Sequence, residues 1–209
     1  PFSSMADGAV KNVLLIKEKK LDAKILIVLD PGHGGFDPGA IAGGVREADL
    51  MLLLAFELRD ALQRTNGIDV LLTREDNTYP SLAKRLRFAH REKADVFISL
   101  HADSVTEGIA KGTTIYTVSD QASDEISARI AKEHDRAELL VGVDLKGAED
   151  NIADVLIDLA RQDSIPRSIA LAETTIHGVR SAVGSVNAKP LRQANFSVLK
   201  SPDIPSVLI

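Results

Sequence analysis

Lys24-Ile-Leu-Ile-Val-Leu-Asp30 is an apolar, β-branched run that stops at Pro31-Gly32, and it decides the fold. A run of this kind predicts a strand inside a sheet that is covered on both faces. Residues 68–73 (IDVLLT) and 95–100 (DVFISL) have the same character. Segments with helical spacing separate the three runs, so the order strand, helix, strand, helix, strand predicts a largely parallel α/β sheet with right-handed crossovers.

Two helices are expected between these strands. Residues 47–64 carry five leucines at helical spacing, which predicts a helix with one buried face. These leucines are Leu50, Leu53, Leu54, Leu58 and Leu62. Residues 80–93 are expected to form the second helix, with Pro80 as an early helical residue.

The second half of the chain is expected to be mainly helical. Residues 113–118 predict another short strand, and apolar residues at three- and four-residue steps then predict an unusually long helical region up to about residue 195. Its expected helices cover residues 123–140, 152–160 and 165–183. The segments 196–199 and 207–209 return to strand-like sequence.

Composition limits the classes of protein and of site. A chain of 209 residues with 44% hydrophobic content is long enough for one domain with a continuous core. The net charge of −5 gives no reason to expect nucleic acid or an anionic membrane as a partner, and the lack of an apolar run of about 18 residues argues against membrane insertion. Because cysteine is absent, any zinc must be held by histidine and carboxylate side chains.

Three residues have the types and positions of a zinc site. His33 follows the first strand and His101 follows the third, so both are expected at the carboxyl edge of the sheet, while Glu47 begins the first helix. Two histidines and one glutamate suit catalytic zinc, which keeps a fourth position open for water. A histidine after a strand is also commonly a loop or capping residue, and spacing alone leaves both interpretations open. His90, His134 and His177 fall in expected helices and are weaker candidates.

Five segments in order resemble the zinc-dependent N-acetylmuramoyl-L-alanine amidases that separate bacterial daughter cells. The resemblance begins at Asp30-Pro-Gly-His-Gly-Gly35 and extends over residues 24–209. The other segments are residues 46–50 (READL), 72–76 (LTRED), 94–103 (ADVFISLHAD) and 196–209 (FSVLKSPDIPSVLI). By this resemblance the fold is a twisted, mixed and largely parallel sheet of about six strands flanked by helices, forming a single catalytic domain over residues 1–209 with 1–23 as a lead-in.

The resemblance also implies an activity. Zn²⁺ is expected on His33, Glu47 and His101, and the substrate is peptidoglycan, cut at the amide bond between N-acetylmuramic acid and L-alanine. This substrate implies the periplasm or the cell exterior. In the family the catalytic glutamate directly follows a segment like residues 205–209, so we expect it immediately after Ile209 and expect the C-terminal end to be truncated. Without that glutamate, the chain is expected to bind zinc but hydrolyse little.

Residues of about 120–163 resemble the helical regulatory insertion of the cell-division type. In that subgroup an acidic side chain blocks the open zinc position until a protein activator displaces it. Ala137-Glu138-Leu139-Leu140 resembles the blocking segment, so Glu138 is the first candidate, with Glu133, His134 and Glu149 left open. Acidic residues on an amphipathic helix are also commonly a solvated face, which is the other interpretation.

Two other classes of protein are compatible with the sequence. One is a different zinc amidohydrolase or peptidase that uses the same three ligands on another amide bond. The other is a non-catalytic or regulatory zinc-binding wall module, which the expected position of the glutamate beyond Ile209 would favour. Arg74 and Arg85 could contact acidic substrate groups or form salt bridges with neighbouring carboxylates.

Overall fold

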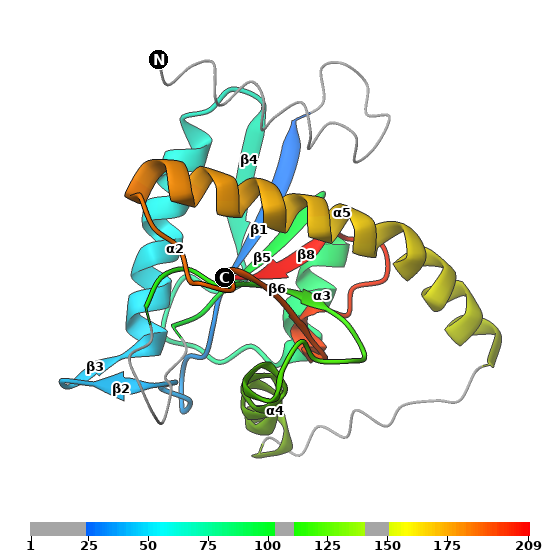
Figure 1. The fold of residues 1–209 in the computed structure, drawn as a ribbon, viewed down its shortest axis with the longest axis horizontal. Helices are drawn as coiled ribbons and strands as arrows, with labels where there is room; N and C mark the ends of the chain where they lie inside the picture. The colour runs from blue at the N-terminus through cyan, green and yellow to red at the C-terminus, as the bar shows by residue number, and fades with distance from the viewer. Residues whose placement is uncertain (1–23, 103–110, 141–150) are drawn as a thin grey trace.

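The computed structural model describes residues 24–102, 111–140 and 151–209, with the backbone alone described for 137–140 and 151–162. Six strands form the main sheet (Figure 1). In spatial order they are β4 (Ile68–Leu72), β1 (Ile25–Pro31), β5 (Val96–Leu100), β8 (Ser206–Leu208), β6 (Ile115–Val118) and β7 (Leu191–Ala194). β6 is antiparallel to β8, and the other neighbouring pairs are parallel. The prediction of a mixed, largely parallel sheet of about six strands is confirmed.

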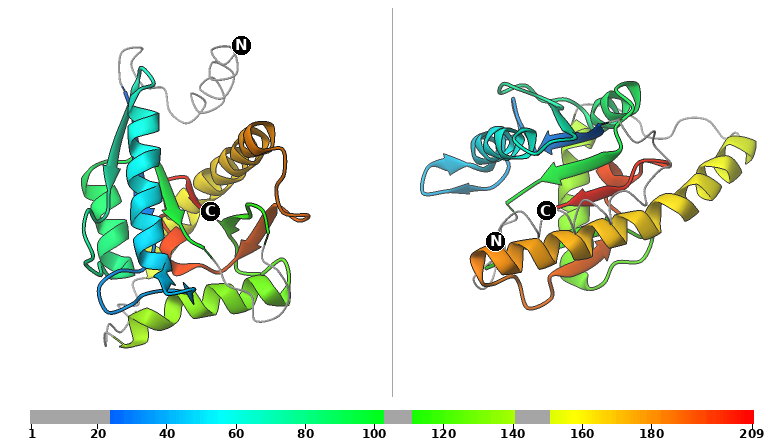
Figure 2. Two further views of the ribbon diagram at one scale, coloured as in Figure 1. Left: turned by 90° about the vertical axis from the view of Figure 1, so that its left-hand side faces the viewer. Right: turned by 90° about the horizontal axis from the view of Figure 1, so that it is seen from above.

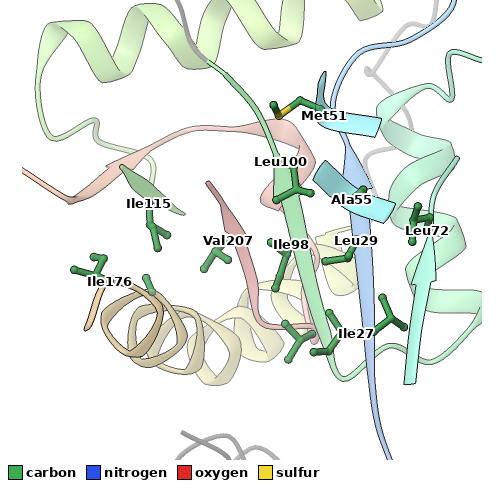
Figure 3. Packing of buried hydrophobic residues seen from close by; sticks show 13 residues of the cluster. Ile27, Leu29, Met51, Ala55, Leu72, Ile98, Leu100, Ile115, Ile176 and Val207 are labelled. Carbon is green, nitrogen blue, oxygen red and sulfur yellow. The ribbon is translucent and has the colours of Figure 1, made fainter. Parts of the chain in front are cut away.

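Helices cover both faces of this sheet. They are α2 (Glu47–Gln63), α3 (Leu82–Arg91), α4 (Glu125–Leu140) and α5 (Asn151–Val183), with a short 3-10 helix η2 (Ser197–Leu199). α2 and α5 pack on one face, where Met51 and Ile176 join the core beside the strand side chains (Figure 3). α3 and α4 pack on the other face, where Ala89 and Ile130 lie in a cluster around Phe97. The core is therefore two apolar layers separated by the sheet.

α4 packs on the same face as α3, near one end of the sheet (Figure 2). In Figures 1 and 2 it occupies the same end as the start of α2 and the hairpin formed by β2 (Ile41–Ala42) and β3 (Val45–Arg46). The carboxyl ends of β1 and β5 point to this end of the molecule. Any side chains that follow those strands are therefore close to α4.

The buried face of α2 differs from the prediction. Leu50, Leu53 and Leu54 are exposed, whereas Met51 and Ala55 are buried against the sheet, and Leu58 and Leu62 are partly buried against the same core. Close packing of a helix on a sheet favours short or flexible side chains at the contact. The leucine spacing therefore predicted the helix correctly and its buried face only in part, at Leu58 and Leu62.

Four features in the rest of the chain also differ from the prediction. The expected helices 152–160 and 165–183 are one helix, α5, which continues through Pro166. Strand β7 (Leu191–Ala194) was missed, and residues 197–199 form a 3-10 helix instead of a strand. Pro80 lies outside α3, whose N-cap is Ser81 with its hydroxyl accepting a hydrogen bond from the Lys84 amide. Among the described residues, no helix is both long and apolar enough to cross a membrane.

Candidate metal centre

His33 is positioned by an unusual backbone immediately after β1. Its φ is 59°, in the left-handed region that residues with a side chain rarely adopt. The guanidinium of Arg74 donates to the carbonyls of Pro31 (2.9 Å) and Gly32 (2.8 Å), and that of Arg85 donates to the carbonyl of His33 (2.9 Å). Three successive carbonyl groups are thereby held, and the turn directs the His33 ring toward the carboxyl edge of the sheet.

Both arginines are buried and act on the protein itself. Arg85 forms a 2.6 Å ion pair with Asp30, whose carboxylate also accepts hydrogen bonds from Thr73 and Ser99. Although burial opposes ionisation, Arg85 and these hydroxyl donors hold the pKa of Asp30 below its usual value. Arg74 contacts carbonyl oxygens instead of a carboxylate. Of the two roles considered from the sequence, Arg85 takes the salt bridge, and Arg74 takes a third role as a backbone support.

Glu47 lies at the first position of α2, where the helix dipole favours a carboxylate. It is only 4% exposed. Its two oxygen atoms accept hydrogen bonds from the amides of Ala102 (2.7 Å) and Ala40 (2.9 Å). The carboxylate is thereby oriented from both sides, with Oε1 turned toward the two histidines.

His101 follows β5 and lies beside the last residue of the chain. Its amide donates to the carbonyl of Ile209 at 2.8 Å, which continues the pairing between β5 and β8. Its ring lies against the backbone of Gly32, where a Cβ atom would come within 2.3 Å of Cε1. The glycine in the Asp30–Gly35 motif is therefore required by the ring of a residue 69 positions later.

The three predicted ligands meet at one point. Glu47 Oε1 lies 3.1 Å from His33 Nε2 and 3.1 Å from His101 Nδ1, and the two nitrogen atoms are 3.2 Å apart. Ligand atoms about 2.0–2.1 Å from a tetrahedral zinc ion are about 3.3 Å from one another. The donor set and its spacing fit a metal ion, and these three side chains form the one such cluster in the part of the chain that the structure describes.

The charges in the cluster are strongly coupled. Despite burial, hydrogen bonds to the carboxylates of Asp37 and Glu47 raise the pKa of His33 to about 9. Burial and the neighbouring His134 and His33 lower the pKa of His101 to about 4. Hydrogen bonds from the two histidines outweigh burial and hold the pKa of Glu47 well below its usual range. In the metal-free protein at neutral pH, His33 is therefore the charged imidazole of the cluster and His101 is neutral.

Asp37 is a functional residue that the sequence reasoning missed. Its Oδ2 atom is 2.8 Å from His33 Nδ1, and its Oδ1 atom accepts a hydrogen bond from the Gly39 amide at 3.1 Å. A carboxylate on the far nitrogen of a histidine fixes the ring orientation and leaves Nε2 to face a metal. The signal was the short spacing of four residues within the same glycine-rich loop, where a carboxylate can fold back onto the histidine.

α4 places His134 over this cluster. The centroid of its ring is 4.1 Å from that of His101 and 5.9 Å from that of His33. With these rings it lines a cavity of about 20 Å³, which has room for about one water molecule. His134 is not one of the three grouped ligands, in keeping with its weaker standing as a metal ligand, and the packing of α4 brings it beside them, so it stays open as a blocking residue.

The other candidates for blocking the site are less defined by the structure. Glu133 is exposed on α4. Glu138 is part of α4, but its side chain lies outside the described residues, as does the whole of Glu149. His90 and His177, the two remaining weaker candidates for metal ligands, are on the surfaces of α3 and α5. Only His134 among them is shown beside the three predicted ligands.

The fold and the cluster define an α/β protein with a candidate metal centre at the carboxyl edge of its sheet. The N-acetylmuramoyl-L-alanine amidase family matches residues 27–209. AmiA of Escherichia coli, an N-acetylmuramoyl-L-alanine amidase, is 36% identical over 218 residues that cover 100% of this chain and 75% of AmiA. AmiC of Neisseria meningitidis is 32% identical, covering 88% of this chain and 44% of AmiC. The chain belongs to the N-acetylmuramoyl-L-alanine amidases, as the motifs predicted.

Solved structures agree with this assignment. An N-acetylmuramoyl-L-alanine amidase of Clostridium difficile 630 is 26% identical with a TM-score of 0.55, covering 88% of this chain and 77% of that one. AmiC2 of Nostoc punctiforme has a TM-score of 0.54 at 24% identity over 90% of this chain and 78% of its own, a likeness of fold. The sheet order and helix layers described above are therefore those of the family's catalytic domain.

Proposed function

We propose that the protein is a zinc-dependent peptidoglycan amidase that hydrolyses the amide bond between the lactyl group of N-acetylmuramic acid and L-alanine. The observation that carries this proposal is the convergence of His33, Glu47 and His101 in a chain of the amidase family. Two imidazoles and one carboxylate are a donor set of catalytic zinc sites, in which a further position stays open to water and substrate.

Each residue of the site has a separate part in this reaction. His33, Glu47 and His101 would hold the ion, which when bound supplies an acidic water and polarises the substrate carbonyl. Asp37 keeps the His33 ring oriented for this task. The oxygen of the water adds to the lactyl carbonyl carbon, the carbon–nitrogen bond breaks, and the proton goes to the amine of L-alanine.

A glutamate at the position after Ile209 would carry that proton. The hydrogen bond from the His101 amide to the Ile209 carbonyl supports this assignment, because it puts the end of β8 beside the cluster. A residue added there follows the strand toward the same edge of the sheet. We therefore base the activity test on two proteins, the 209-residue chain and the same chain extended by glutamate.

The test measures zinc content and the products from purified peptidoglycan. The 209-residue chain should bind about one zinc, and the extended chain should also release stem peptides with free L-alanine amino termini. His33→Ala, Glu47→Gln and His101→Ala should abolish both zinc binding and hydrolysis, whereas the exposed His177→Ala should change neither. New amino termini on other residues would instead indicate a peptidase. Zinc binding without hydrolysis by the extended chain would indicate a non-catalytic wall module.

We further propose that the helical insertion of about residues 120–163, of which 141–150 lie outside the described residues, keeps the site closed until a protein activator displaces it. The cavity beside His33 and His101 has room for about one water molecule. This is less space than the amide bond to be cut and its flanking groups need. Glu138 lies four residues after His134, a spacing that puts both on one face of a helix, and it remains the first candidate for the blocking ligand.

The blocking ligand is tested in the extended chain. Glu138→Ala should raise the basal rate of peptidoglycan hydrolysis, and Glu133→Ala, on the exposed side of the same helix, should leave it unchanged. A raised rate for Glu133→Ala with no change for Glu138→Ala would indicate that Glu133 is the blocking ligand. Since peptidoglycan lies outside the cytoplasmic membrane, we place the reaction in the cell envelope, in the periplasm or at the cell exterior, and daughter-cell separation is the process in which we expect it.

A further inference from the structure

The ring of His134 is wedged between the metal centre and the core. It packs on the His101 ring with centroids 4.1 Å apart and planes inclined at 39°. On another side it makes an edge contact with Phe196, with centroids 5.5 Å apart, and Phe196 itself is fully buried. One side chain of α4 thus contacts both a predicted ligand and the apolar layer beneath it.

α4 is held in this position by contacts on both sides of His134. One turn earlier, Ile130 and Ala131 are buried in the core. One residue later, the Asp135 carboxylate accepts hydrogen bonds from the Ser197 hydroxyl at 2.8 Å and from its amide at 3.3 Å. These contacts anchor α4 on both sides of His134 and so hold the backbone of this residue beside the site.

His134 packs beside the predicted metal ligands and is not one of them. The ligand atoms of His33, Glu47 and His101 lie within 4.8 Å of one another, and His134 is not part of that group. It nevertheless lines the 20 Å³ cavity with His33 and His101. What the ring contributes is therefore volume and contact: it lines the small cavity beside His33 and His101 and packs on the His101 ring.

We propose that His134 is the closing contact of α4, a positioning residue whose ring shape, and not its nitrogen atoms, keeps the metal centre shut and His101 in place. This inference rests on the proposed zinc site. It identifies His134 as the side chain through which α4 covers that site. It is independent of which acidic residue blocks the metal. Opening the site then requires the ring of His134 to leave His101.

The test is the rate at which a chelator removes zinc from the 209-residue protein. Side chains outside the ligand set commonly change metal affinity by about 10–100-fold. We expect His134→Ala to release zinc at least about tenfold faster than the unsubstituted protein, and His134→Phe, which keeps a ring, to stay within about twofold of it. His177→Ala, on the surface of α5, serves as the matched control for removal of a histidine. Circular dichroism melting of each variant verifies that the helices remain folded.

The outcomes separate this inference from the function on which it rests. If His134→Ala releases zinc at the unsubstituted rate, the closing role is wrong and the metal site stands. If His134→Phe is as fast as His134→Ala, a nitrogen atom of His134 is needed and the packing role is wrong. If the unsubstituted protein binds no zinc, the proposed function and this inference fail together. If His134→Ala has lost its helical structure, a folded His134→Leu takes its place as the variant without a ring: release at least about tenfold faster supports the packing role, and release within about twofold of the unsubstituted rate overturns it.

Discussion

At the scale of single residues, the site depends on side chains outside the predicted ligand set. His33 has φ 59°, a conformation that costs a residue with a Cβ atom about 1–2 kcal/mol. The buried guanidinium groups of Arg74 and Arg85 hold the carbonyls around it and so offset this cost. Both arginines therefore support the metal centre indirectly, because their guanidinium groups bind backbone carbonyls around His33 and not the side chains of the three predicted ligands.

Asp37 gives the first prediction at this scale. Asp37→Ala removes the 2.8 Å hydrogen bond to His33 Nδ1, so the ring loses its fixed orientation and zinc affinity should fall about 10–100-fold. Competition with a zinc indicator measures the affinity. Asp49→Ala removes an exposed carboxylate two residues after Glu47 and should have no effect. Equal affinities for Asp37→Ala and the unsubstituted protein would show that the hydrogen bond does not orient the ligand.

The raised pKa of His33 gives a second prediction. Below about pH 9 the metal-free protein carries a proton on His33, whereas His101, with a pKa of about 4, is already neutral at pH 7. A metal requires the neutral imidazole, so binding at pH 7 should release about one proton, and zinc affinity should rise about tenfold per pH unit until about pH 9. Calorimetry in two buffers of different ionisation enthalpy counts the protons. Release of none would contradict the charge assignment.

At the scale of elements, α2 shows that spacing and burial are separate properties. Its leucines repeat at helical intervals, yet Leu53 is 58% exposed and Met51 is 6% exposed. The periodicity of a helix can be read from many residues, but the strip that contacts the sheet depends on which side chains fit closely. α4 illustrates the same point, because its sequence did not distinguish His134 from Glu133.

The orientation of α2 is tested by two substitutions to alanine. Met51→Ala creates a cavity between the helix and the sheet and should lower the free energy of unfolding by about 2–5 kcal/mol. Leu53→Ala on the outer side should change it by no more than about 0.5 kcal/mol. Urea unfolding of the two variants provides the comparison. A larger effect at Leu53 would mean that the leucine face is buried, as the spacing alone had suggested.

At the scale of the whole molecule, the metal centre joins three separate elements. His33 follows β1, Glu47 begins α2 and His101 follows β5, and the two strands are neighbours in the sheet. Parallel neighbours bring their carboxyl ends to one edge, so residues 68 positions apart lie within 3.2 Å. The end of β8 reaches the same edge through Ile209.

Zinc should therefore stabilise the entire fold. Free zinc at about 100 times its Kd adds about 2.7 kcal/mol to the free energy of unfolding, because the unfolded chain does not hold the three ligands together. The midpoint of thermal unfolding should rise with zinc and return to the metal-free value after chelation. His101→Ala should remove the dependence on zinc. If the midpoint did not change with zinc, zinc would not bind preferentially to the folded protein and the predicted stabilisation would be wrong.

The sequence by itself determined the family, the α/β class and the three candidate ligands. Those properties are carried by short motifs and by apolar runs, whose local chemistry is visible without knowledge of the neighbours. The position of β7, the single helix α5 and the inner face of α2 were decided by packing, since burial against a distant strand outweighs local preference. The same holds for Asp37, Gly32 and His134. Asp37 acts through His33, whereas Gly32 and His134 act through His101. Gly32 and His134 are each more than 30 positions from His101 in the sequence, so only the folded sheet and α4 bring them into contact with it.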